Sequence, residues 1–140
     1  MSNKSTFRLT FHVFHPTISA SEIENAFRLP VRFSQSAGGQ KKTKTGNLLG
    51  GIYTHTNVSF LLHDNPLQFD KISIDDLIKK QLESYDTDYI YTLVETGGSC
   101  NFLLGIFSNE SIMFEFDNEV IHALSSSRVS MKFDFYGGEK

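Results

Sequence analysis

The residues of this chain that are best suited to chemistry are five histidines and one cysteine. The histidines are His12, His15, His55, His63 and His122. None of them falls in a zinc-binding spacing such as His-Glu-x-x-His, so the sequence predicts no metal site. His12 and His55 fall on the polar sides of two expected strands and would form a pair if those strands were neighbours. Cys100 has no base nearby in the sequence to lower its pKa, so we do not expect a nucleophile.

Carboxylates and a glycine-rich loop offer two further kinds of chemistry. Asp117 and Asp134 would form a general acid-base pair only across neighbouring strands, and helix capping or surface hydration explains both more simply. A phosphate-binding loop requires Gly-x-x-x-x-Gly-Lys-Ser/Thr. Here Gly39 and Gly46 are too far apart, and Asn47 follows Gly46. The sequence therefore predicts no catalytic residues and no cofactor, and we expect a non-catalytic domain.

The charges of the chain are divided between its two parts. Residues 1–62 hold seven basic and two acidic side chains, whereas residues 63–140 hold six basic and fourteen acidic ones. Residues 81–127 contain no Lys or Arg. We interpret this stretch either as a hydrated acidic surface or as a contact face for a basic protein, since complementary fields raise on-rate and specificity. The expected contact residues are Glu83, Asp86, Asp88, Glu110, Glu115, Asp117 and Glu119.

Hydrophobic periodicity and capping residues predict the elements that position these side chains. Helices are expected after the caps at Ser19, Ser73 and Asp117 or Asn118, and Pro30 ends the first of them. Alternating apolar residues predict strands at 7–14, 52–62, 89–95, 101–107, 111–116 and 128–136. Residues 34–51 hold five glycines and the basic cluster Lys41, Lys42 and Lys44 without periodicity, which predicts a flexible loop.

The predicted order of elements is β-α-β-α-β-β-β-α-β, in one domain spanning residues 1–140. Short links between strands favour antiparallel hairpins. We therefore expect an α+β fold in which a mostly antiparallel sheet of about six strands carries three short helices on one side. The last strand shows the clearest alternation, because Val129, Met131, Phe133 and Phe135 fall on one face.

Composition limits the compartment and the partners. The chain has 13 Phe and no Trp, which predicts a core built largely on Phe. One cysteine excludes a disulfide scaffold. The first residues are polar, and no apolar run approaches the roughly 20 residues needed to cross a bilayer, so we expect a cytoplasmic protein without a membrane partner. A net charge of -3 and a basic loop without interleaved aromatics argue against nucleic acid.

The closing part of the chain is similar to the family known as domain of unknown function 4279. The likeness consists of an apolar strand, a capped helix with Val120, Ile121 and Leu124, and a strand ending in Phe133-Asp134-Phe135-Tyr136-Gly137. The opening strand and helix, with Arg28-Leu29 and Pro30, also resemble the family. Tyr53 stands where such proteins often have Trp. The resemblance implies a small bacterial α+β domain and supplies no catalytic residues.

Two functions from different classes follow from these observations. We expect a protein-binding domain, in particular an immunity-type inhibitor whose acidic face occludes a basic toxin, such as a nuclease, encoded nearby. The alternative is a small-ligand-binding or enzymatic domain with a site between the open sheet face and the glycine-rich loop. The residues expected at that site are His12, Lys41, Lys42, Tyr53 and His55. A homo-oligomer formed through a sheet face or edge is a third interpretation.

Overall fold

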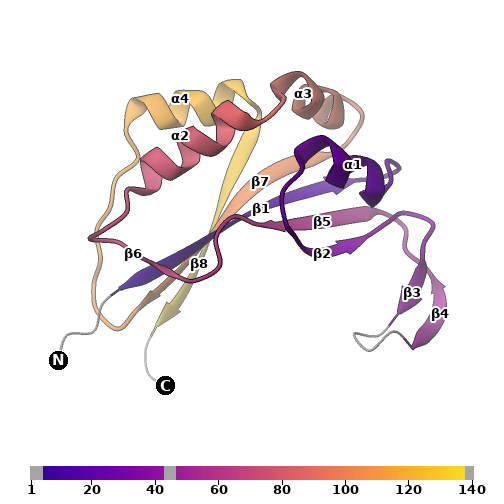
Figure 1. The fold of residues 1–140 in the computed structure, drawn as a ribbon, viewed down its shortest axis with the longest axis horizontal. Coiled ribbons are helices and arrows are strands. Elements are labelled where there is room, and N and C mark those ends of the chain that lie inside the picture. The colour runs from indigo at the N-terminus through magenta and orange to yellow at the C-terminus, as the bar shows by residue number, and fades with distance from the viewer. Residues whose placement is uncertain (1–4, 43–46, 138–140) are drawn as a thin grey trace.

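A computed structural model shows one main sheet with helices on one of its faces (Figure 1). It describes residues 5–42 and 47–137. The helices in this part of the chain are α1 (Ala20–Phe27), α2 (Ile74–Ser84), α3 (Thr87–Glu95) and α4 (Asn118–Ser126). The strands are β1 (Thr6–His15), β2 (Val31–Gln35), β3 (Gln40–Lys42), β4 (Leu48–Ile52), β5 (Thr56–Leu61), β6 (Leu67–Gln68), β7 (Ser99–Ser108) and β8 (Val129–Gly137).

The main sheet has six strands in the order β2-β5-β1-β7-β8, with β6 paired to the start of β1. β1 lies at the centre and pairs antiparallel with both β5 and β7. β8 pairs with β7 in parallel, and α4 forms the crossover between them. The predicted α+β class and mostly antiparallel sheet are therefore confirmed, although the described residues form four helices and a different order of strands.

The core lies between the sheet and the helices and is rich in aromatic rings. Every second residue of β1 points into it, and Phe7, Leu9, Phe11 and Val13 are at most 1% exposed. The Phe11 ring lies 4.7 to 6.2 Å, between centroids, from the rings of four other buried residues. The predicted face of β1 and the Phe-based core are both confirmed.

Three helices begin where their capping residues predict. The hydroxyls of Ser19 and Ser73 accept hydrogen bonds from the amides of Glu22 and Asp76, each at 3.2 Å. The Asp117 carboxylate accepts from the Val120 amide at 2.9 Å. Such bonds satisfy amides that the first helical turn leaves without a partner.

The strand predicted at 89–95 is wrong, because these residues form helix α3. Their aromatic and β-branched side chains favour a strand by propensity, but propensity is a weak determinant beside local capping and burial. The Asp86 carboxylate caps the helix by accepting from the amides of Asp88 and Tyr89. Ile90 and Leu93, spaced three residues apart, are fully buried.

The strand predicted at 111–116 is also wrong, although its alternation is real. Ile112, Phe114 and Phe116 are half-buried, whereas the residues between them are exposed. The segment belongs to the connection between β7 and α4, and the adjacent position beside β7 is taken by β8. The segment therefore has an apolar side but does not pair with a strand. In place of the predicted antiparallel hairpins, a crossover through α4 connects the parallel strands β7 and β8.

Within the range predicted as a loop at 34–51, the described residues include β3 and β4, and the strand predicted at 52–62 is shorter. β3 and β4 pair as a separate two-stranded sheet that projects from the main one (Figure 1). Tyr53 closes its base, since its carbonyl accepts from the Gly38 amide and its amide donates to the Gly39 carbonyl, both at 2.8 Å. β5 begins only at Thr56. Lys44 lies outside the described residues.

Candidate binding surfaces

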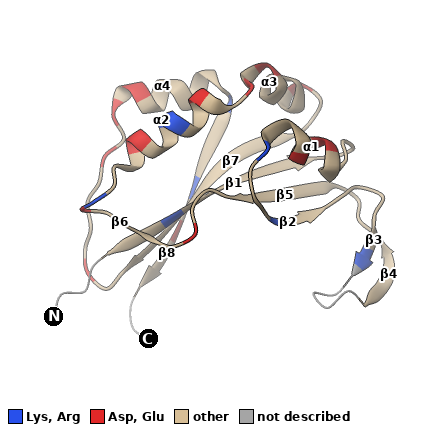
Figure 2. Ribbon diagram, in the orientation of Figure 1, with Lys and Arg blue, Asp and Glu red and all other residues tan. Residues whose placement is uncertain are grey.

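The seven predicted contact carboxylates lie on or next to helices α2, α3 and α4 and in the connection that leads from β7 to α4. Figure 2 shows most acidic residues on the helices and their connections, and several basic ones on the strands. Glu83 ends α2, while Asp86 and Asp88 begin α3. Glu110 and Glu115 lie in the connection between β7 and α4, whereas Asp117 and Glu119 begin α4. The carboxylates are thus spread from the helices to the end of β7 rather than gathered in one cluster.

Lys79 on α2 neutralises part of this surface. Its ammonium lies 3.2 Å from the Glu119 carboxylate and 3.7 Å from that of Asp117. The Asp117 amide in turn donates to the Asp75 carboxylate at 3.0 Å. The Val120 amide lowers the pKa of Asp117, whereas burial raises the pKa of Asp75. Asp117 and Glu119 therefore join α2 to α4 through Lys79.

Four of the predicted carboxylates remain available to a partner. They are Glu83, Asp88, Glu110 and Glu115, which we call the acidic surface. All four are exposed, and their carboxylates form no hydrogen bond or ion pair among the described residues. Asp86, by contrast, is occupied in capping α3.

The other face of the main sheet carries no helix, and its centre is polar. His12 on β1 lies opposite Ser59 on β5 and Asn101 on β7. Asn101 lies opposite Ser130 on β8, and Leu103 lies opposite Lys132. Side chains from four neighbouring strands therefore share this face, which we call the open face.

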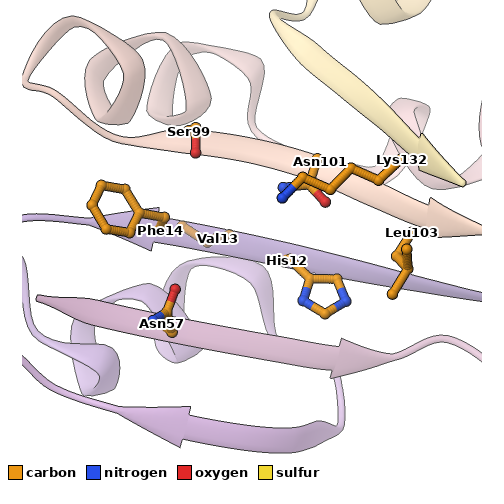
Figure 3. Close-up of a pocket in the computed structure, with 8 residues that line it drawn as sticks. All are labelled: His12, Val13, Phe14, Asn57, Ser99, Asn101, Leu103 and Lys132. Carbon is orange, nitrogen blue, oxygen red and sulfur yellow. The ribbon is translucent and has the colours of Figure 1, made fainter. Parts of the chain in front are cut away.

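A pocket of about 310 Å³ lies on the open face around His12. Figure 3 shows Lys132 extending from β8 over Asn101, with Asn57 and Ser99 further along the neighbouring strands. The residues that line it are His12, Val13, Phe14, Asn57, Ser99, Asn101, Leu103 and Lys132. The pocket thus offers amide, hydroxyl, imidazole and ammonium groups to a polar ligand.

His12 is held without charge in this pocket. Its Nε2 lies 2.9 Å from the Thr10 hydroxyl. Burial lowers its pKa, and the positive charges of Arg32 and Lys132 lower it further. Near neutral pH the imidazole therefore has one donor and one acceptor nitrogen, while the cations beside it supply the positive charge.

A second pocket, of about 250 Å³, adjoins the first at Leu103. Its cationic residues are Arg8 and Arg32, and the stacked rings of Phe107 and Tyr136, 4.8 Å apart, form one wall. The Arg32 guanidinium donates to the Ser59 hydroxyl at 3.2 Å, which orients it over β5. The two pockets together place three permanent cations along the open face.

Of the five residues predicted for the alternative site, only His12 lines one of these two pockets. His55 stands beside the pocket, with its ring 5.1 Å from that of Phe14. Tyr53 and Lys41 belong to the projecting hairpin and line neither pocket. The side chain of Lys42 lies outside the described part of the structure.

Sequence reasoning missed the cations that face these pockets. Arg8 and Lys132 occupy polar positions in alternating strands, and that alternation is the signal that assigns them to the open face. Their convergence depends on β1, β7 and β8 being neighbours, which the alternation does not reveal. Arg32 lies in β2, a strand that the sequence pattern did not predict.

Other chemistry finds little support in the described part of the chain. No group of three or more His, Cys, Asp or Glu there is placed to hold a metal ion. Cys100 is buried, and burial raises the pKa of its thiol to about 12. Among the helices in residues 5–42 and 47–137, none is long and apolar enough to cross a membrane.

No family model, curated protein or solved structure matches this chain. The resemblance to the domain of unknown function 4279 family therefore stays a prediction.

Proposed function

We propose that this chain is a protein-binding domain that occludes a basic partner with its acidic surface. The partner that fits best is a basic toxin encoded nearby, which makes the chain an immunity-type inhibitor acting in a bacterial cytoplasm. The observation that supports this proposal is the set of exposed carboxylates of Glu83, Asp88, Glu110 and Glu115, which form no hydrogen bond or ion pair among residues 5–42 and 47–137. Occlusion requires a rigid surface of the right charge and no catalytic group.

The size of the helical side is compatible with a single partner. Helix α2 has 11 residues, and at 1.5 Å per residue it spans about 16 Å. A standard interface covers about 800 Å² on each protein, which is wide enough to reach both ends of α2. Carboxylates at the rim of such an interface accelerate association and make it sensitive to salt.

The proposal is tested with the basic protein encoded beside this chain. We expect a complex by co-purification, with an affinity that falls as NaCl rises from about 0.05 to 0.5 M in titration calorimetry. The variant Glu83→Lys/Glu115→Lys changes two exposed carboxylates that make no bonds within the described residues. It should weaken binding about 5- to 30-fold, since each rim charge contributes about 0.5–1 kcal/mol.

The matched control is Arg32→Gln, which removes a charge from the open face. It should leave the affinity for the basic protein unchanged. Circular dichroism checks that each variant is folded. An affinity that does not respond to salt or to the double reversal contradicts occlusion through the acidic surface.

A second candidate function is the binding of a small anion on the open face. Arg8, Arg32 and Lys132 line two adjoining pockets, and neutral His12 lies among them. Guanidinium and ammonium groups are the usual partners of phosphate and carboxylate. This candidate keeps the predicted ligand-binding alternative but moves its site from the glycine-rich loop to the sheet.

Inorganic phosphate and a nucleoside monophosphate are suitable probes for this candidate. A ligand present at 100 times its Kd stabilises the fold by about 2.7 kcal/mol, which raises Tm by several degrees. Arg32→Gln should abolish that rise, and Glu83→Lys/Glu115→Lys should not. Equal rises in both variants contradict an open-face site.

A further inference from the structure

The edge formed by β8 is the long, regular edge of the main sheet. β8 pairs with β7 on one side, and its register runs without interruption from Cys100 opposite Val129 to Ser108 opposite Gly137. The other edge, β2, has five residues and a register shift between Val31 and Phe33. Short or bulged edges resist pairing with another chain, whereas a long and regular edge is a template for it.

From Lys132 onward, the side chains of β8 are exposed on both faces of the sheet. On the helical side, Phe133 and Phe135 are 46% and 64% exposed, beyond the cover that α4 gives to Val129. On the open face, Lys132 and Asp134 alternate with them and are also exposed. An exposed apolar row beside an unpaired strand edge is typical of an interaction surface.

We propose that β8 pairs antiparallel with β8 of a second copy of this chain, about a two-fold axis at Phe133. A two-fold contact between copies is self-complementary. When the axis is perpendicular to the sheet, the helical sides of the two copies lie on the same face of the joined sheet. Two residues that lie directly opposite each other must then both have their side chains on the helical side or both on the open face. The axis must therefore pass through a residue position, and only a few registers remain.

The charges on β8 favour the register centred at Phe133 over the two registers next to it. With the axis at Phe133, Lys132 lies opposite Asp134 of the second copy, and Asp134 lies opposite Lys132 of that copy. With the axis at Lys132 or at Asp134, like charges face each other across the axis. Opposite charges stabilise a cross-strand pair and like charges destabilise it.

The apolar residues of β8 agree with the same register. Phe133 then meets Phe133 of the second copy, and Met131 meets Phe135 of the second copy on the helical side. Aromatic pairs across antiparallel strands are favourable neighbours. The pairing joins two β2-β5-β1-β7-β8 paths into one continuous sheet, and it involves Lys132, which also lines the first open-face pocket.

The proposal is tested by charge swapping and measurement of mass in solution. Size-exclusion chromatography with light scattering, at about 100 μM protein, should give twice the 15.8 kDa of the chain. Lys132→Asp and Asp134→Lys should each raise the Kd of the dimer about 10-fold or more. The combined swap Lys132→Asp/Asp134→Lys should restore it to within about 3-fold of the original value.

Lys132→Asp is the cleaner single variant, because Asp134 also accepts a hydrogen bond from the Tyr136 hydroxyl at 2.6 Å. Lys80→Asp makes the same charge change at an exposed site on α2, and it should leave the dimer intact. Circular dichroism confirms the fold of each variant. A monomer at every concentration overturns the proposal, and a dimer that the combined swap fails to restore overturns the register.

Discussion

His15 at the end of β1 is held in one protonation state by its hydrogen bonds. Its Nδ1 accepts from the amides of Thr17 and Ile18, both at 3.0 Å, so this nitrogen carries no proton. Nε2 therefore carries the proton and donates to the Thr96 hydroxyl at 2.7 Å. The side chain is 1% exposed, and burial lowers its pKa below 6.5, against a smaller opposing effect of Glu22. We predict that protonation of His15 destabilises the fold.

The direction of the pH effect follows from the lowered pKa. As the pH falls below 6.5, the ordinary value for histidine, the unfolded chain takes up its proton before the folded one does. The free energy of unfolding then decreases, with a limiting slope of about 1.4 kcal/mol per pH unit for one proton. The loss is complete once the pH is below the folded-state pKa, and His15 contributes its full stabilisation above pH 6.5.

Two substitutions separate the acceptor role of His15 from its titration. His15→Ala removes the acceptor of the part-buried hydrogen bonds from the Thr17 and Ile18 amides. Each lost bond costs about 1–2 kcal/mol, so we expect a loss of about 2–4 kcal/mol near neutral pH. His15→Asn places an amide oxygen near the position of Nδ1, as in a turn closed by Asn, and it does not titrate. It should recover about 1–3 kcal/mol of that loss.

Urea denaturation followed by circular dichroism, at about pH 7.5, 6.5 and 5.5, measures both effects. His15→Asn should show a shallower decline in unfolding free energy than the unmodified protein over this range. His122→Asn is the control, since His122 is exposed on α4. An unchanged pH slope in His15→Asn would refute the titration argument, and equal stability of the Asn and Ala variants would refute the acceptor role.

Two further predictions concern the start of β7. A Cβ on Gly98 would lie 2.6 Å from the Phe14 carbonyl oxygen and 2.8 Å from that of Leu93, so Gly98→Ala should cost about 1–3 kcal/mol or more in thermal or urea unfolding. Gly50→Ala, with open space around it, should cost less. Because the pKa of Cys100 is raised to about 12, its thiol should not react with a disulfide reagent at about pH 8 until the protein is unfolded. Rapid reaction of the native thiol would contradict this burial.

The features that the sequence predicts correctly depend on local interactions. The alternation of β1 needs only the pleat of a strand, and the caps of α1, α2 and α4 bind amides three residues away. Helix α3 was missed because its aromatic and β-branched residues favour a strand, and the core rather than propensity decides its conformation. The parallel pairing of β7 and β8 is a tertiary choice that no short segment encodes.

The candidate surfaces show the same limit. The sequence identifies carboxylates in a stretch without cations, but Lys79 lies just outside that stretch and pairs with two of them. His12 and Lys132 each fall on polar sides of predicted strands. Their meeting requires the order β1-β7-β8. The uneven distribution of charge along the sequence thus predicted that acidic and basic residues lie on different parts of the molecule. The tertiary structure determines which face holds each charge.

The topology of the sheet allows the proposed interactions to be tested separately. Glu83 and Glu115 lie on the helical side, and Arg32 lies on β2, at the opposite edge from β8. Lys132 belongs to both the open-face pocket and the β8 edge. Arg32→Gln should therefore remove anion binding without affecting the dimer, whereas Lys132→Asp should affect both. If Arg32→Gln also changes the Kd of the dimer, anion binding and self-association are coupled, and pairing of the β8 edges does not by itself explain the dimer.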